Sequence, residues 1–265
     1  MELQYASDLH IDDFPSVSYD ATLTPVAPVL LLAGDLCSVW KPAYAAFLRW
    51  CSQRWRLVVV IAGNHEYFCE PGASKTMDEA DDEARRVAAS LGNVVFLQGG
   101  DSLQIPGTNL RVVGATLWSA VAPSIHHEIL EKGDYACTYT ATPTGIRKTT
   151  PMDICALHAL QKAQLQSALA SHPKDRLILM THHLPTLSLV APRFAGHRRS
   201  SCFASADDDL FLHENLALVV CGHSHQSVQR RLSTGVLAVM NARGYATEQG
   251  TTGYSSRASI RLPTA

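Results

Sequence analysis

The sequence predicts an α/β protein, because short buried strands alternate with amphipathic helices over the first half and strands dominate the last quarter. Five apolar runs are short enough, and most of them β-branched enough, to be buried strands. Each run ends in a polar cluster, and ligands collect beyond the carboxyl ends of strands in layered sheets. The five runs cover residues 3–6, 29–33, 57–62, 177–180 and 216–221.

Helical patterns lie between these strands. One begins with a capping box formed by Thr76 and Glu79, and acidic residues crowd its first turn. A longer pattern has Thr150 as its candidate N-cap and Pro151 at its first helical position, and it leads directly into the fourth strand. Apolar residues line one face of each pattern. The three patterns cover residues 42–55, 76–91 and 152–171.

The last quarter of the chain changes character. Residues 228–232, 236–240 and 256–262 look like successive strands, and residues 233–235 provide a tight connection between the first two. We therefore expect a second, partly antiparallel sheet. A further strand is predicted at residues 110–118.

Residues 119–151 show no periodicity. An irregular segment of this length is uncommon inside a compact domain and is often functional. No internal repeat and no linker divides the chain. We therefore predict a single domain over residues 1–265, with a substrate-side insertion at residues 119–151.

Composition narrows the class of protein. The chain has 265 residues, of which 46% are hydrophobic and 17% charged, as in a compact globular protein. Its formal charge is -2, so a polyanion-binding surface is not indicated. There is no signal-peptide pattern and no run long enough to span a membrane. The seven cysteines form no Cys-x-x-Cys pair, which argues against a zinc ribbon or a disulfide framework and favours a cytoplasmic location.

The polar clusters at the strand ends carry the chemistry. Each is a weak signal alone, since Asp-x-His and Gly-Asp are common in turns. The candidate metal ligands among their residues are two carboxylates, one amide and four imidazoles, namely Asp8, Asp35, Asn64, His10, His182, His223 and His225. The clusters are Asp8-Leu9-His10, Gly34-Asp35, Gly63-Asn64-His65-Glu66, Thr181-His182-His183 and Gly222-His223-Ser224-His225.

This donor set predicts a metal site. Mixed oxygen and nitrogen ligands suit Mn, Fe, Zn or Ni better than Ca, and the absence of thiolates argues against a structural zinc site. Seven ligands are too many for one tetrahedral ion but suit two ions that share a bridge, for which Asp35 is the natural candidate. Two such ions can hold a hydroxide between them and neutralise phosphate oxygens. The sequence therefore predicts a phosphoester hydrolase.

The order and residue types of the clusters resemble the motifs of the calcineurin-like metallophosphoesterase superfamily, whose pattern is Asp-x-His, Gly-Asp, Gly-Asn-His-Asp/Glu, His and Gly-His-x-His. The resemblance spans residues 8–225. Residues 241–245 also resemble the Asn-Pro-Arg-Gly-Tyr ending of small bacterial members of unassigned substrate, although Ala242 replaces the proline. The resemblance implies a four-layer α-β-β-α sandwich with two mixed sheets and a metal site at the carboxyl ends of the strands.

The resemblance also implies roles for individual residues. His65 would be the catalytic imidazole that faces the substrate, and Glu66 would either orient it or form a salt bridge. Arg243 and His183 are candidate substrate-binding residues. Two divalent transition metal ions are implied, with Mn preferred over Fe, Zn or Ni. One ion would be held by Asp8, His10, Asp35 and His225, and the other by Asp35, Asn64, His182 and His223.

Several functions fit these residues. Protein phosphatases of the superfamily carry Asp-Arg after Gly-Asp-x-Val, whereas this chain reads Gly34-Asp35-Leu36-Cys37-Ser38-Val39-Trp40, so that activity is not expected. We favour hydrolysis of a small-molecule or nucleotide phosphoester, a diester more than a monoester. The alternatives are a nuclease on single-stranded nucleic acid, hydrolysis of a non-phosphate ester or amide, and a scaffold that has lost its chemistry. The loops at residues 119–151 and 184–203 would select the substrate.

Overall fold

The first of two facing β-sheets contains five strands. The computed structural model describes residues 1–264 and orders this sheet β13-β1-β2-β3-β4. Strands β1 to β4 are parallel, so their carboxyl ends share one edge, whereas β13 is antiparallel to β1. The strands are β1 (Glu2–Ala6), β2 (Val29–Ala33), β3 (Leu57–Ile61), β4 (Val94–Leu97) and β13 (Ser259–Arg261).

The second sheet contains six strands in the order β11-β12-β10-β9-β6-β5. Its four central strands are parallel, and the edge strands β11 and β5 are antiparallel to their neighbours. The predicted second, partly antiparallel sheet is therefore present. The strands are β5 (Asp101–Gln104), β6 (Leu110–Ala115), β9 (Arg176–Thr181), β10 (Leu216–Cys221), β11 (Ser227–Arg231) and β12 (Leu237–Asn241).

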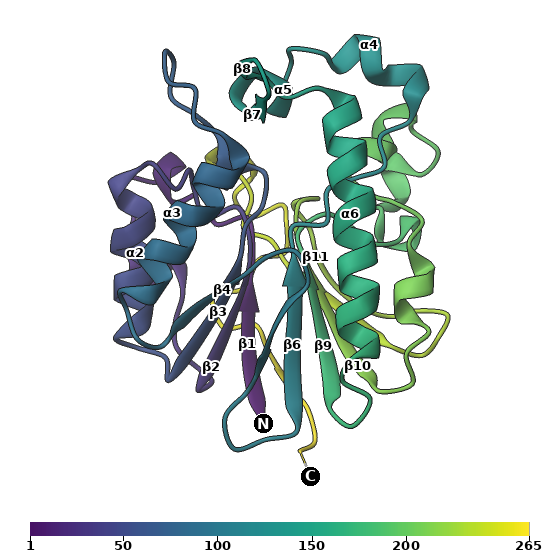
Figure 1. Ribbon diagram of the computed structural model, residues 1–265. Coiled ribbons are helices and arrows are strands. Elements are labelled where there is room, and N and C mark those ends of the chain that lie inside the picture. The colour runs from purple at the N-terminus through teal and green to yellow at the C-terminus, as the bar shows by residue number, and fades with distance from the viewer. Residues whose placement is uncertain (265) are drawn as a thin grey trace.

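The two sheets pack face to face between outer layers of helices (Figure 1). Helices α2 (Pro42–Ser52) and α3 (Met77–Ala89) cover the first sheet, and α6 (Pro151–Ala170) covers the second. Leu31 packs in the core between the sheets, while its neighbour Leu30 packs in the core beneath α2 and α3. Burial on both faces explains why the strands read as continuous apolar runs. The predicted four-layer α-β-β-α architecture is confirmed.

The helix boundaries follow their caps. Thr76 and Glu79 form the predicted capping box at the start of α3. Thr150 caps α6 before Pro151, and Asp153 completes a second capping box there. The short helices outside residues 119–151 are α1 (Tyr19–Thr22) and the 3-10 turns η1 (Ile11–Asp13), η2 (His65–Tyr67), η4 (Leu187–Leu189), η5 (Pro192–Phe194), η6 (Arg198–Cys202), η7 (Asp208–Phe211) and η8 (Ala246–Glu248).

Residues 119–151 are folded, so the expectation of an irregular segment was wrong. Each element has only three or four residues, which is too short to show a period in the sequence. The segment lies beyond the carboxyl edges of the sheets, at the top of Figure 1. It contains η3 (Pro123–Ile125), α4 (His126–Ile129), α5 (Asp134–Cys137) and the hairpin of β7 (Tyr139–Thr142) and β8 (Gly145–Lys148).

Two strand predictions need correction. The strand expected at residues 110–118 ends at Ala115, because the backbone of Leu117 turns to a positive φ of 44°. The strand expected at residues 256–262 is shorter and pairs with β1 in the first sheet, not with its predecessors in the second. Pairing between the two ends of a chain leaves no local sequence signal. Strands β4 and β5 were not predicted.

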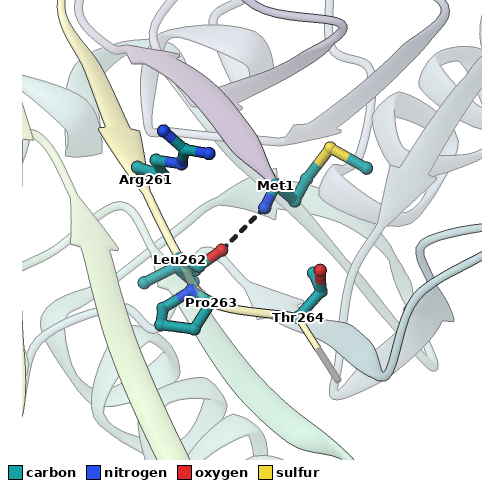
Figure 2. A pocket seen from close by; sticks show the side chains of 5 residues that line it. All are labelled: Met1, Arg261, Leu262, Pro263 and Thr264. Atoms are coloured by element: carbon teal, nitrogen blue, oxygen red, sulfur yellow. Dashed lines mark hydrogen bonds between the residues drawn. The ribbon is translucent and has the colours of Figure 1, made fainter.

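The amino edge of the first sheet lies far from the polar clusters. There the amino group of Met1 donates a hydrogen bond of 2.7 Å to the carbonyl oxygen of Leu262, as Figure 2 shows. Both ends of the described chain lie at the bottom of Figure 1, opposite residues 119–151. Within residues 1–264, no helix combines the length and apolar character needed to cross a membrane.

Candidate metal centre

The polar clusters meet in space at the carboxyl edges of both sheets. Asp8, His10 and His225 bring their ligand atoms within 4.8 Å of one another, and Asp35, His182 and His223 form a second such group. Asn64 joins the second group, because its Oδ1 lies 3.0 Å from His182 Nε2. His10 Nε2 and His225 Nε2 are 3.1 Å apart. All seven predicted ligands are thus gathered in two adjoining groups.

Asp35, a member of the second group, also lies close to the first. Its Oδ2 is 3.4 Å from Nε2 of His182 and 3.9 Å from Nε2 of His10. This oxygen is buried and accepts no hydrogen bond, whereas Oδ1 accepts one of 2.9 Å from the backbone N–H of His65. A buried carboxylate oxygen without a donor is costly unless a cation balances it. The position of Asp35 fits the predicted bridge between two ions.

The tautomers of two histidines are fixed from outside the cluster. Nδ1 of His182 lies 2.8 Å from the carbonyl oxygen of Ala33, and Nδ1 of His225 lies 2.5 Å from Oε2 of Glu248. Both acceptors require a proton on Nδ1, which makes Nε2 of each ring the nitrogen that is directed into the cluster. The donor set therefore fits divalent metal ions.

The charges of the cluster match this donor set. Burial lowers the pKa of His10 to about 3 and that of His223 well below its usual range, so both imidazoles are neutral and able to bind a metal. Although burial opposes it, His182 holds the pKa of Asp35 well below its usual range. Burial also opposes the charge on His182, but Asp35 raises its pKa to about 10. A bound cation would compete with that proton.

The backbone of the ligands is unusual. Of the seven non-glycine residues with a positive φ in residues 1–264, five are predicted ligands, and such conformations are uncommon and cost free energy. The strain is therefore concentrated where the side chains must converge. The five residues and their φ values are Asp8 (52°), His10 (40°), Asp35 (56°), His223 (68°) and His225 (41°).

Two glycines allow this convergence. A Cβ at Gly63 would lie 2.2 Å from Asp35 Oδ1, and one at Gly222 would lie 2.7 Å from Asp8 Oδ2. The missing side chain at Gly222 also lets the next backbone N–H, that of His223, donate to Asp8 Oδ1 at 2.9 Å. The glycines of the motifs are thus required by the close approach of backbone to carboxylate.

Glu66 has a role that neither sequence alternative described. Its buried carboxylate accepts backbone hydrogen bonds from Asp35 (2.9 Å), Leu36 (2.7 Å) and Gly63 (2.7 Å). It thereby ties the loop after β2 to the loop after β3. Burial, and after it the charge of Asp35, raises the pKa of Glu66 to about 8.

His65 is a partly exposed imidazole of the cluster, with 20% of its side chain accessible. Its Nε2 lies 4.0 Å from Asp35 Oδ2 and 3.1 Å from the hydroxyl of Tyr245. The Tyr245 ring also packs against His10, with ring centroids 4.4 Å apart. The predicted catalytic imidazole therefore reaches the solvent side of the carboxylate.

Sequence reasoning missed three residues around this site. Asp134, from α5, accepts a hydrogen bond of 3.0 Å from Asn64 Nδ2, which turns the amide oxygen toward His182. No motif surrounds Asp134, so the sequence held no signal for it. Tyr245 ends the run at residues 241–245 that resembles Asn-Pro-Arg-Gly-Tyr but was assigned no role, and Glu248 follows it by three positions without a motif of its own.

The two candidate substrate-binding residues lie behind the ligands. The guanidinium of Arg243 is buried 3.5 Å above the ring centre of Phe14 and donates to the carbonyl oxygen of Leu9 at 3.4 Å. The His183 ring lies between those of Trp118 and His223, with centroid separations of 5.1 and 4.0 Å. Burial lowers the pKa of both residues. Their part in substrate binding stays a prediction.

Comparison with known proteins places this geometry in a family. The fold resembles that of a phosphopantetheinyl hydrolase from Mycobacterium tuberculosis, with a TM-score of 0.73, 16% identity, and coverage of 97% of this chain and 95% of that one. It also resembles a dimetal phosphatase from Danio rerio, with a TM-score of 0.50, 13% identity, and coverage of 91% and 87%. An uncharacterized protein, L509, from Acanthamoeba polyphaga mimivirus is 20% identical over 265 residues, covering 93% of this chain and 92% of the viral protein. The family model for calcineurin-like phosphoesterases matches residues 6–227, and the chain therefore belongs to that family.

Proposed function

We propose that this protein uses two divalent transition metal ions, Mn before Fe, Zn or Ni, to hydrolyse a small-molecule or nucleotide phosphodiester. Membership of the family implies metal-dependent phosphoester hydrolysis, and the proposal refines the metal and the substrate. The observation that carries it is the buried Oδ2 of Asp35, which accepts no hydrogen bond and lies between the two groups of imidazoles.

The residues of the cluster have different chemical roles in this proposal. Ions held here would supply positive charge for the phosphate oxygens and would lower the pKa of an attacking water. Asp8 and Asp35 would supply the negative charge that retains such ions. His65 reaches the open side of Asp35, where its Nε2 can give a proton to the leaving oxygen. The Tyr245 hydroxyl holds that nitrogen in place.

The charges around the cluster favour a diester over a monoester. A monoester carries up to two negative charges on its phosphate and is commonly held by an arginine fork. In the described chain no Lys or Arg side chain is hydrogen-bonded or ion-paired to any of the seven predicted ligands. Arg243 is directed at Leu9 and Phe14. A diester, with one negative charge, suits this environment.

The first test is hydrolysis of bis-p-nitrophenyl phosphate and p-nitrophenyl phosphate with added Mn. We expect Mn-dependent turnover, faster on the diester, and a loss of more than roughly 100-fold in Asp35→Asn, since loss of a residue behind a ligand already costs 10 to 100-fold. Asp12→Asn, which removes a carboxylate paired with Lys41 outside the cluster, should keep full activity.

The outcomes separate the alternatives. Absence of bound metal in protein purified without chelator, with no rise in melting temperature on adding metal, would favour a scaffold. Bound metal without turnover on either ester would contradict the phosphoesterase proposal. A panel of cyclic nucleotides, nucleotides, dinucleotides and single-stranded DNA would identify the substrate class. A phosphopantetheinyl diester belongs in the panel because a neighbour in fold is named for that reaction.

The proposal includes a cytoplasmic location. All seven cysteines are free thiols in the structure, which supports a reducing compartment. A fluorescent fusion that accumulated outside the cytoplasm would contradict it.

A further inference from the structure

We propose that Glu248 is a positioning residue of the metal centre, which holds His225 so that its Nε2 faces Asp8 and His10. The inference rests on the proposed function in that it takes the cluster to bind metal. Glu248 belongs to none of the five motif clusters and follows the ligand that it contacts by 23 positions.

The contact fixes which nitrogen of His225 is available. Glu248 Oε2 lies 2.5 Å from Nδ1 of His225, and a carboxylate there requires the ring proton on Nδ1. The lone pair is then on Nε2, which lies 3.5 Å from Asp8 Oδ1 and 3.1 Å from His10 Nε2. A carboxylate behind an imidazole fixes its orientation and makes it a stronger ligand.

The backbone around Glu248 is shaped for this contact. Gly244 has a φ of +77°, and a Cβ there would lie 2.8 Å from Glu248 Oε2. The N–H of Gly244 donates to the carbonyl oxygen of Asp8 at 3.0 Å, which ties the turn to a predicted ligand. The N–H of Tyr245 donates to Oε2 at 2.9 Å. The Glu248 carboxylate thus accepts one hydrogen bond from the backbone of the turn and another from Nδ1–H of His225.

The contact affects one ion more than the other. Among the four predicted imidazole ligands in the described chain, His225 is the one whose nitrogen outside the cluster contacts a carboxylate. His182 is oriented instead by the backbone carbonyl of Ala33. Loss of Glu248 should therefore weaken the ion held by Asp8, His10 and His225. The ion held by Asn64, His182 and His223 should be largely unaffected.

The experiment compares Mn binding to metal-free wild type, Glu248→Ala and Glu248→Gln by titration calorimetry. We expect two binding events in wild type, of which Glu248→Ala weakens one by about 10 to 100-fold. Glu248→Gln should lose less, because its amide oxygen still accepts the His225 proton. Glu79→Ala is the matched control, since Glu79 closes the capping box of α3 but contacts no histidine. It should bind Mn as wild type does.

A second readout follows the histidine itself. Nitrogen-15 NMR of metal-free protein should show His225 in the Nδ1-protonated tautomer in wild type and a mixture of tautomers in Glu248→Ala. Equal Mn affinities in wild type and folded Glu248→Ala, or an unchanged tautomer, would overturn the proposal. A wild type that binds no Mn would instead overturn the proposed function, and the NMR result would still decide whether Glu248 orients His225.

Discussion

The loops that follow the two sheets contribute different chemistry to one site. The first sheet supplies both carboxylates, from Asp8 and Asp35, together with His10, the amide of Asn64 and the candidate acid His65. The second sheet supplies imidazoles alone, from His182, His223 and His225. The first sheet thus provides the negative charge that attracts a cation, and the second sheet provides three of the five neutral donors. A complete donor set exists only while the sheets are packed together.

The loops also hold each other in place across this boundary. The carbonyl of Ala33, at the end of β2, orients His182 from the second sheet. In return, the backbone N–H of His223 donates to Asp8 from the first sheet. Each side therefore depends on the other for orientation as well as for composition. The following predictions separate these contributions, beginning with the largest effect.

Removal of Glu66 should damage the first-sheet loops most. Glu66→Ala leaves the N–H groups of Asp35, Leu36 and Gly63 without their acceptor, and each stranded group costs roughly 1 kcal/mol or more. We expect the free energy of unfolding to fall by at least about 3 kcal/mol in urea denaturation. Glu70→Ala, which removes a largely exposed glutamate that pairs with Lys41, should change it little. Equal effects of the two substitutions would show that the buried carboxylate does not join the loops.

Removal of metal should destabilise the contact between the sheets. A ligand that binds only the folded state at 100 times its Kd adds about 2.7 kcal/mol to stability. Melting temperatures should therefore rise with Mn and fall with a chelator. Asp35→Asn, on the first sheet, and His182→Ala, on the second, should each lose most of this response. A variant that kept the full response would show that one sheet binds the ion without the other.

Loss of a helix cap should destabilise the protein equally, whether the helix covers the first sheet or the second. Thr76→Ala at α3 and Thr150→Ala at α6 should each lower the free energy of unfolding by about 1 kcal/mol, because each removes one side of a capping box.

The stability that the α6 cap contributes should also depend on pH. The hydrogen bond from Arg147 is the main cause that lowers the pKa of Asp153 to about 2. The stability that ionised Asp153 contributes to the fold is present above its ordinary pKa near 3.8 and is lost as the pH falls toward about 2.

Denaturation at pH 7 and at pH 2.5 measures both effects. The difference between wild type and Asp153→Asn should shrink at the lower pH. If the two threonine substitutions lowered the free energy of unfolding by different amounts, part of the difference between the two sheets would come from the helices that cover them rather than from the site.

Tyr245→Phe should have the smallest effect. Tyr245 follows the second sheet, but its hydroxyl contacts His65 from the first. The substitution removes that hydrogen bond and keeps the ring against His10, so the loss is about 0.5 kcal/mol, or two to threefold in kcat. KM should be unchanged. A change larger than tenfold would indicate that the hydroxyl does more than hold His65.

The sequence was most informative at the strand ends, where candidate ligands directly follow apolar runs. The apolar runs before Asp8, Asp35 and His182 were recognised because buried parallel strands have few polar residues. The gathering of the seven ligands followed from the shared edge of those strands. Thr150 and Pro151 were found because caps have local rules.

The rest depends on contacts between distant segments. Nothing near residues 259–261 indicates that they pair with β1, and the four-residue elements of the 119–151 segment are too short for a period. Glu66 was noted, but its three partners come from loops that only the folded chain brings together. Asp134 and Glu248 act on ligands through hydrogen bonds that no motif records.

The separation of the donors along the chain has a consequence for how the protein acquires its metal. Asp8 and His223 are 215 positions apart, so the chain must close a very long loop before they meet. A growing chain on the ribosome holds an incomplete donor set until most of it has been made. We therefore expect loading to follow folding. In stopped-flow refolding, Mn should leave the folding rate unchanged and slow unfolding alone.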